Sequence, residues 1–493
     1  MPDMNRRQFI ARSTGAAAFG SIAASTLHPH FMPPATALDL HIDTATKEMP
    51  EMDFDIRTIP DFCSHEHWGS INSIGPAPEQ NGFRADTTAG ARPTRDTSVW
   101  DLLLDPYAGG WMFAAGRNPH AAARTAGAAS LEEWWNSNPE AALTSFQESA
   151  APLLLTGVFQ CTRRGIAHLY GIDLARFDLE EWQQVDKEVR TRYADLFAWY
   201  RTAMAQAHFS ELIRPVHPEF YVQYDTEAEK AEELAFTSTI LRIDPLMALW
   251  QAESPRRDAL AQITGIDPVD AATWREFITA LLDLAAENHT TGIKQLQAYS
   301  RSLRYEPVGD REVTFRGDLS QDGIVVFQDW VMHECCKQAH ERNWPHQVHV
   351  GTHNLGDSNP MPLEDLSQRY PNMDIVMLHC WPYLREAGWL AKHRPNIYID
   401  TCWMPVLNPA FLREALTMWI NYVPAHKIML AHDSTSVEMA TGSSLFTREI
   451  LAEALTSQQQ ALQLPSAVLH TVAADMLQNN AVRVYGIGEQ FKV

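Results

Sequence analysis

Two histidines one residue apart, His65 and His67, are the feature of this sequence with the clearest chemical meaning. Side chains alternate across a β-strand, so residues i and i+2 point to the same face. A strand that carries this pair would aim both imidazoles at one point, and imidazole is a common ligand of catalytic metals. The pair therefore predicts a metal site at the end of a strand.

Three further candidate ligands each close a short apolar run farther along the chain. They are His349, His379 and Asp433, and each run is typical of a buried strand. A divalent metal with an open coordination position lowers the pKa of water and generates hydroxide. We expect Asp433 to accept the proton of that water and pass it to the leaving group, and His379 to orient water or polarise the scissile bond.

Eight runs of apolar or β-branched residues have the length of strands, and helical stretches separate most of them. The runs are residues 59–67, 212–221, 238–246, 292–299, 347–351, 374–379, 396–401 and 427–433. Strands that alternate with helices predict an α/β fold with a parallel sheet, and eight of them indicate a closed (β/α)8 TIM barrel. Active sites of that fold lie at the carboxyl ends of the strands, where the candidate ligands fall.

The segment between the first two predicted strands is far longer than a bare barrel requires. Residues 70–95 are rich in Gly, Pro and Asn and predict a loop, whereas residues 131–208 read as helices. We interpret residues 70–210 as a loop and helical insertion that caps the mouth of a barrel domain spanning 55–490. A helical embellishment that only adds stability explains the same pattern.

The amino terminus predicts a targeting segment. Arg6 and Arg7 form a twin-arginine pattern, and a weakly apolar stretch over 15–24 follows them. We therefore expect residues 1–37 to be a twin-arginine signal peptide and disordered leader, and the protein to be periplasmic or otherwise exported by this bacterial route. A basic disordered tail is the alternative. The stretch is too short and too polar to cross a bilayer, so we expect no stable membrane span.

Composition limits the class of partner. The 493 residues carry a formal net charge of −22, and a polyanion such as nucleic acid would be repelled. A small-molecule substrate is the expected partner, and a homo-oligomer is compatible with the sequence. The six cysteines show neither disulfide nor zinc-motif spacing, so we interpret them as packing residues.

The ordered ligand set resembles that of the amidohydrolase superfamily, with a His-x-His on strand one, a His on strands five and six, and an Asp on strand eight. Local phrases look closer still to its amidohydrolase-related (amidohydrolase 2) family. Among them are Gly292-Ile-Lys-Gln-Leu-Gln-Ala-Tyr299 and His379-Cys-Trp-Pro-Tyr383. The resemblance covers residues 61–486. One departure is His432, because the family usually has a glycine directly before the strand-eight aspartate.

The resemblance implies a divalent metal held by His65, His67 and Asp433, with one or both of His349 and His379. Zinc is the expected ion, with manganese, iron and nickel as alternatives. Binuclear members of the superfamily carry a carboxylated lysine on strand four that bridges two metals.

Lys294, in the predicted fourth strand, resembles that bridging lysine. A buried lysine paired with an acid is the alternative reading. We therefore expect one or two ions, and the number stays open.

Residues near the predicted strand ends are candidates for substrate contact. Arg301 could clamp a carboxylate through two hydrogen bonds, and a surface ion pair is the alternative. Trp381, with Trp68 and Trp403, could wall a pocket for a ring, although tryptophan in a core is commoner. Tyr299 is the remaining predicted substrate contact.

The whole pattern predicts a metal-dependent hydrolase of the amidohydrolase type, in which metal-bound hydroxide cleaves a C–N or C–O bond of a small molecule. The family resemblance also allows a decarboxylase or a uronate-isomerase-like enzyme on the same barrel. A non-catalytic periplasmic binding protein is a third alternative. The complete ligand set argues against it, because a binding protein has no need of an open metal site.

Overall fold

The computed structural model describes residues 55–68, 95–105, 107, 112, 116–219 and 227–487. The chain divides into two units, Met1–Glu51 and Met52–Val493, and every described residue belongs to the second. The predicted signal segment and most of the predicted loop over 70–95 lie outside the described residues.

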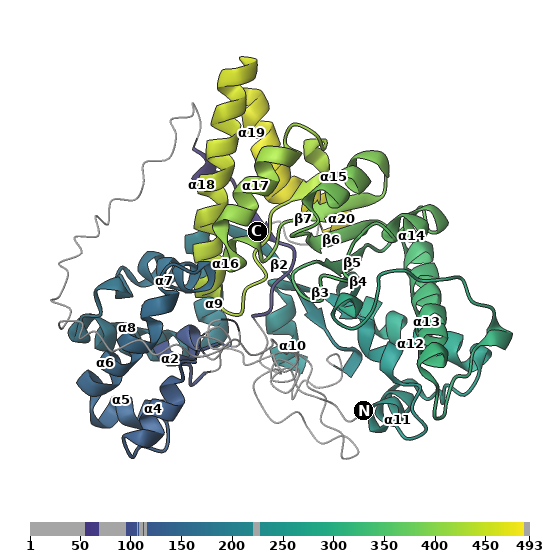
Figure 1. The fold of residues 1–493 in the computed structure, drawn as a ribbon, viewed down its shortest axis with the longest axis horizontal. Helices are drawn as coiled ribbons and strands as arrows, with labels where there is room; N and C mark the ends of the chain where they lie inside the picture. Colours follow the sequence, from purple (N-terminus) through teal and green to yellow (C-terminus); the bar gives the residue numbers. More distant parts are fainter. Residues whose placement is uncertain are drawn as a thin grey trace, which may run out of the picture. The chain divides into compact units, whose positions relative to one another are not determined.

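An eight-stranded parallel sheet in sequential strand order organises the fold (Figure 1). Its strands are β1 (Asp61–Cys63), β2 (Phe209–Val216), β3 (Thr237–Arg242), β4 (Thr290–Gln295), β5 (His346–Val350), β6 (Ile375–His379), β7 (Ile397–Asp400) and β8 (Ile428–Met429). Nearly every strand residue is buried, as expected of a parallel sheet covered on both faces. Each predicted strand overlaps an observed one, so the α/β prediction is confirmed.

The two edge strands, β1 and β8, meet through backbone hydrogen bonds just beyond their ends. The amide of Asp433 donates to the carbonyl of His65, and the amide of His67 donates to the carbonyl of Ser434, each at 2.9 Å. Glu66, between the two histidines, donates its amide to β2 at 2.9 Å. The segment after β1 is therefore held between both neighbours.

The histidine pair lies in this held segment and not within a strand, so that detail of the prediction is wrong. β1 ends at Cys63, because the amide of Ser64 turns back to the carbonyl of Phe62 at 2.9 Å. Backbone contacts on both sides nevertheless direct His65 and His67 toward the same atom, Asp433 Oδ1. The two imidazoles therefore converge, as the sequence pattern predicts.

Helices connect the later strands. They are α10 (Glu227–Leu234), α11 (Pro255–Thr264), α12 (Ala271–Ala286), α13 (Gln321–Arg342), α14 (Leu363–Arg369), α15 (Leu384–His393), α16 (Met404–Leu407) and α17 (Pro409–Trp419). Side-chain caps fix where they begin: Asp270 accepts from the Thr273 amide at 2.9 Å before α12, and Ser320 accepts from the Gly323 amide at 3.1 Å before α13.

The described part of the chain between β1 and β2 is largely helical. It carries α2 (Val99–Leu103), α4 (Pro119–Thr125), α5 (Leu131–Ser137), α6 (Pro139–Ala150), α7 (Gly157–Tyr170), α8 (Leu179–Tyr193) and α9 (Leu196–Ala207), here called the helical region. Trp100 stands at its centre, with ring centroids 5.1 Å from Trp135 and Phe146 and 5.4 Å from Trp182. These rings belong to a hydrophobic cluster that also includes Leu212 of β2 and Val437 of α18, so the helical region, whose ribbon is blue in Figure 1, shares its core with the rest of the fold.

Helix α18 (Val437–Leu462) follows β8 and packs against α7. A Cβ on Gly165 of α7 would lie 1.7 Å from the carbonyl oxygen of Glu438, and one on Gly442 of α18 would lie 1.8 Å from that of Cys161. Only glycine lets the two backbones approach so closely.

Glu438 also ties α18 to the helical region through its side chain. The hydroxyls of Tyr170 and Tyr193 each donate to its carboxyl group at 2.7 Å, and the indole of Trp199 donates at 3.3 Å. These donors, from α7, α8 and α9, satisfy a carboxyl group with no exposed surface.

Helices α19 (Ser466–Ala474) and α20 (Asn480–Tyr485) end the described chain. Tyr485 and Val484 of α20 share one core cluster with Phe62 of β1 and Met429 of β8. None of the described helices combines the length and apolarity needed to cross a bilayer.

Candidate metal centre

Asp433 lies at the centre of a buried group of histidines. Its Oδ1 is 3.1 Å from His67 Nε2 and 4.0 Å from His65 Nε2, and its Oδ2 is 3.6 Å from His379 Nε2. Ligand atoms of His65, His67 and Asp433 all lie within 4.8 Å of one another. A single ion can bridge such a spacing, so this nitrogen and oxygen donor set fits a divalent metal.

Burial and neighbouring charges favour the metal-binding forms of these side chains. Burial, and then the charge of Lys294, lowers the pKa of His65 well below its ordinary value, and burial lowers the pKa of His379 to about 3. Burial alone would raise the pKa of Asp433, but His67, whose Nε2 lies 3.1 Å from Oδ1, opposes burial most strongly, and the pKa is held well below its usual range. Neutral imidazole and ionised carboxylate are the forms that coordinate metals.

Contacts at Nδ1 orient two of the histidines. His379 Nδ1 lies 2.7 Å from the carbonyl oxygen of Cys402. A carbonyl only accepts, so Nδ1 carries the proton and the lone pair of Nε2 faces Asp433. His65 Nδ1 lies 2.7 Å from Gln347 Oε1. Such contacts fix the tautomer of metal-binding histidines.

Cys402 brings a sulfur close to the same group. Ligand atoms of His379, Cys402 and Asp433 also lie within 4.8 Å of one another, and the Cys402 Sγ is 3.4 Å from His379 Nδ1. Burial, and then the charge of Asp400, raises the pKa of this thiol well above its ordinary value. The protonated thiol is therefore favoured, in agreement with the packing role expected from the sequence.

His349 lies beside this group. Its ring centroid is 4.4 Å from that of His379, but its Nε2 lies 2.9 Å from the hydroxyl of Thr352. Within the described chain, His349 belongs to neither group of converging ligand atoms.

Lys294 is the buried amine of the centre. It is 1% exposed, and its Nζ has no hydrogen-bond partner within the described part of the chain. Burial lowers its pKa to about 8, although Asp433 opposes that shift. An orphaned buried amine beside a carboxylate fits either a neutral lysine or a lysine that takes part in metal binding through added carbon dioxide.

Arg301, the residue predicted to bind a substrate carboxylate, forms hydrogen bonds with neighbouring protein groups. Its guanidinium donates to Asp329 Oδ1 at 2.6 Å and to the carbonyl of Arg304 at 2.7 Å, and it lies over the ring of Tyr305. The ion pair with Asp329 agrees with the ion-pair alternative, although it is largely buried and not on the surface, and contact of Arg301 with a substrate stays a prediction.

The two other predicted substrate contacts lie in aromatic stacks. Tyr299, in the short turn Gln297–Tyr299, has its ring centroid 4.5 Å from that of His349. Trp381 stacks on Phe411 of α17 at 4.1 Å. Tyr299 therefore contacts His349, which lies beside the group of converging ligands.

The other two tryptophans differ in their surroundings. Trp403 has its ring centroid 5.4 Å from those of His379 and His353, so it borders the centre. Trp68 is fully buried, packs on Tyr200 of the helical region, and donates its indole N–H to Glu66 at 2.9 Å. Trp68 is thus a core residue.

Tyr107 is a contact of the centre that the sequence did not reveal. Its hydroxyl donates to Asp433 Oδ1 at 3.2 Å, and its ring lies 5.2 Å from that of Trp403. It belongs to the long segment between β1 and β2, where no local pattern marks it. Only the fold brings it to the ligands.

Left-handed backbone conformations gather around the centre. Thr352, His379, Cys380, Trp403 and Asp433 have φ values of 64°, 68°, 59°, 69° and 52°. Such values cost a side-chain-bearing residue on the order of 1 kcal/mol each and persist where surrounding structure enforces them, often at functional sites. Here they turn the chain at the ends of four strands toward a common point.

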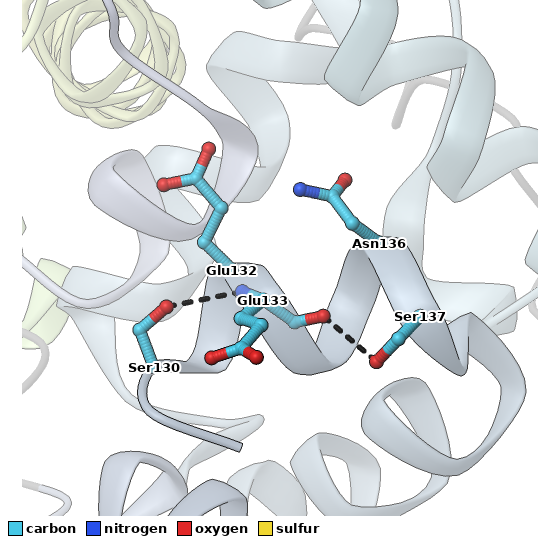
Figure 2. A pocket seen from close by; sticks show the side chains of 5 residues that line it. All are labelled: Ser130, Glu132, Glu133, Asn136 and Ser137. Carbon is cyan, nitrogen blue, oxygen red and sulfur yellow. Dashed lines mark hydrogen bonds between the residues drawn. The ribbon is translucent and has the colours of Figure 1, made fainter.

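A depression on α5 has a different character. Ser130, Glu132, Glu133, Asn136 and Ser137 line it (Figure 2). Ser130 accepts from the Glu133 amide at 3.0 Å and Ser137 donates to the Glu133 carbonyl at 2.8 Å. These are contacts within one helix and its cap, so we assign the depression no part in the chemistry.

Fold and centre together define an α/β protein whose candidate ligands for a divalent metal gather beyond the carboxyl ends of a parallel sheet. The chain belongs to the amidohydrolase family, whose sequence model matches residues 219–487. The match includes His349, His379 and Asp433 and begins after the His65 and His67 pair.

Similar proteins extend this comparison. The fluG protein of Emericella nidulans is 27% identical over 282 residues, which are 52% of this chain and 33% of that protein, so the chain spans about a third of its relative's length. The solved glucuronate isomerase of Caulobacter crescentus is 14% identical, with a TM-score of 0.65 over 89% of this chain and 94% of that chain. The uronate isomerase of Thermotoga maritima is also 14% identical, with a TM-score of 0.65 over 87% and 95%. At this identity the two structures show a shared fold.

Proposed function

We propose that the protein is a metal-dependent hydrolase that cleaves a C–N or C–O bond of a small molecule. The observation that carries the proposal is the position of Asp433, with one carboxylate oxygen toward His67 and the other toward His379. A carboxylate placed in this way can help hold an ion and still exchange a proton with water or substrate.

The residues of the centre have separate roles in this proposal. His65, His67 and Asp433 hold the ion, for which zinc is the expected identity. A divalent ion there supplies Lewis acidity that activates water. Asp433 Oδ2 accepts the proton of the attacking water and returns it to the leaving group. His379, whose proton is held at Nδ1 by the Cys402 carbonyl, presents Nε2 to the reacting groups.

The architecture proposed around this centre is a closed (β/α)8 barrel with the helical region as its cap. Support for closure comes from the two backbone hydrogen bonds that join residues 65–67 to 433–434. Support for the cap comes from Tyr107, which reaches Asp433 from the segment between β1 and β2. We also predict substrate contacts for three residues, Arg301, Tyr299 and Trp381. A homo-oligomer stays a separate prediction.

The reaction is tested with a panel of small amides, esters, lactones and uronates in water enriched in the heavy oxygen isotope. A hydrolase gives products that carry one labelled oxygen. The similar uronate and glucuronate isomerases make a uronate-isomerase-like enzyme the main alternative, and such an enzyme would convert a uronate without adding water. Release of carbon dioxide would indicate a decarboxylase, and tight binding without turnover a binding protein.

Metal binding is tested by mass spectrometry of protein purified without added metal. We expect one or two equivalents of metal in the wild type and loss of metal in His65→Ala. His333→Ala removes a histidine of α13 that bonds to Tyr370 and should keep the wild-type metal content. Loss of one of two ions in Lys294→Ala would establish a bridging lysine. Absence of stoichiometric metal after reconstitution with zinc or manganese would overturn the proposal.

Export by the twin-arginine route is proposed from Arg6 and Arg7. Residues 1–37 fused to a folded reporter should deliver it to the periplasm of a bacterium. Replacement of both arginines by lysine should stop delivery, and continued export of that variant would contradict the proposal.

A further inference from the structure

We propose that Gln347 is a positioning residue that sets both the ring orientation and the tautomer of His65. The proposal rests on the metal site of the proposed function. Gln347 lies on β5, has no exposed surface, and is the register partner of Lys294 on β4. Its Oε1 lies 2.7 Å from His65 Nδ1.

The orientation of the Gln347 amide follows from its other contacts. Its Nε2 lies 2.8 Å from the carbonyl oxygen of Ser64 and 2.7 Å from the hydroxyl of Tyr485. A backbone carbonyl cannot donate, so the side facing Ser64 must be the NH₂ group. A flipped amide would place two oxygens against each other at this distance.

The tautomer of His65 follows in turn. Since the amide oxygen faces His65 Nδ1, that nitrogen must carry the proton, and the lone pair of the ring lies on Nε2. Nε2 is the atom that faces Asp433. The Gln347 amide therefore contacts both the backbone carbonyl of Ser64 and the ring of His65. Together the two contacts fix the backbone before His65 and the orientation of its side chain.

The hydroxyl of Tyr485 accepts the second hydrogen bond of the Gln347 amide nitrogen. This tyrosine comes from α20, at the end of the described chain, and is 4% exposed. Asp400, a buried acid close enough to raise the pKa of Tyr485, already places negative charge in this layer. An amide orients His65 without adding a second negative charge, which a carboxylate in its place would do.

A purely structural role for Gln347 makes a different prediction from a positioning role. If the amide only filled space and satisfied buried groups, metal affinity would follow folding stability across variants. If it sets the tautomer of His65, metal affinity follows the presence of an acceptor for Nδ1–H, whatever the stability.

Two substitutions separate these roles. Gln347→Leu removes the acceptor and keeps the volume. Gln347→Glu keeps an acceptor for His65 but sets an oxygen against the Ser64 carbonyl and buries a charge, so it should be the less stable variant. We expect Gln347→Leu to weaken zinc binding about 10- to 100-fold and Gln347→Glu to recover much of that loss.

The measurement is the zinc dissociation constant of the full chain, obtained by competition with a chromogenic chelator, beside thermal unfolding of the metal-free proteins. Cobalt-loaded samples add a visible spectrum that reports the ligand geometry. Gln347→Met replaces Gln347→Leu if the latter does not fold.

Gln295→Leu is the matched control. Gln295 is a buried amide on the neighbouring strand β4, and its Oε1 accepts from the hydroxyl of Tyr305 at 2.9 Å. It follows Lys294 directly and so faces the opposite side of the sheet. This variant should lose stability and keep the wild-type zinc affinity.

The outcomes distinguish this proposal from the function on which it rests. Wild-type zinc affinity in Gln347→Leu, or an affinity of Gln347→Glu no higher than that of Gln347→Leu, overturns the positioning role alone. Failure of the wild type itself to bind zinc, cobalt or manganese overturns the metal site.

Discussion

The imidazole of His432 lies 3.0 Å from the carboxylate of Asp61, Nε2 to Oδ2. Ser443 lies 3.1 Å from the other ring nitrogen, and Ser444 donates to the same Asp61 oxygen at 2.6 Å. Asp61 opens β1, and His432 follows β8, so the contact joins the two edge strands of the sheet. The residue that departs from the family pattern therefore has a structural partner and contacts Asp61, not the ligand group.

Removal of the His432 side chain should destabilise the protein. His432→Ala removes the imidazole that lies 3.0 Å from the Asp61 carboxylate, which has no exposed surface, and we expect the free energy of unfolding to fall by about 3 kcal/mol. Urea denaturation at pH 7 measures the loss, and metal content should stay at the wild-type level. A stability equal to that of the wild type would show that the contact contributes little.

The same pair predicts a dependence on pH. Burial raises the pKa of Asp61, but His432 and Arg448 outweigh it and hold the pKa below the ordinary value of 3.8. A depressed acid contributes stability above its unfolded pKa and loses it as the pH falls through the folded pKa. The stability difference between wild type and His432→Ala should therefore be complete at pH 7 and shrink below pH 3.8.

Glu211 on β2 should make the protein less stable in mild alkali. Burial raises its pKa from 4.5 to about 8, although hydrogen bonds from Ser238 and Leu212 oppose the shift. The folded carboxyl group keeps its proton after the unfolded one has lost it, so stability falls as the pH rises from 4.5 to about 8.

Glu211→Gln removes this titration. We expect it to be more stable than the wild type by roughly 2 to 4 kcal/mol at pH 9, and similar to it near pH 4. Denaturation of both proteins across this range measures the difference. Parallel stability curves for the two proteins would contradict the assignment.

The contact between α7 and α18 should not tolerate a methyl group. In Gly442→Ala the new Cβ would meet the Cys161 carbonyl at 1.8 Å, so the helices must separate. We expect a loss of about 2 kcal/mol or more in the free energy of unfolding, since overpacking a tight contact forces the backbone to shift. Gly356→Ala is the control, because a Cβ there meets nothing within 4 Å. Equal stabilities of the two variants would disprove the close contact.

Cys402 should be dispensable for metal binding. It orients His379 through its backbone carbonyl at 2.7 Å, and its sulfur lies on the same Nδ1 side of the ring, 3.4 Å away. Cys402→Ala keeps that carbonyl, so metal content and the cobalt spectrum should match the wild type. Loss of an equivalent of metal in this variant would instead make the thiol a ligand.

The fold was predictable because its signals are local. Eight apolar runs and the helical patterns between them follow from the periodicity of side chains in strands and helices. The order of His65, His67, His379 and Asp433 relative to those runs was enough to gather them at one edge, because parallel strands end on the same side. The sequence missed where β1 ends, since Ser64 turns back to Phe62 through a backbone contact that no residue type encodes.

Only the tertiary structure decided how the side chains are oriented and paired. Three hydrogen-bonded pairs illustrate this. They are Gln347 Oε1 with His65 Nδ1, the Thr352 hydroxyl with His349 Nε2, and the Asp329 carboxylate with the Arg301 guanidinium. These partners are set by distances of about 3 Å or less between atoms on different elements, and local periodicity does not encode such distances. The sequence by itself determined the sheet and the ligand types, because alternation and donor chemistry are properties of single residues and near neighbours. The fold decided which donors converge, because convergence depends on packing of the whole chain.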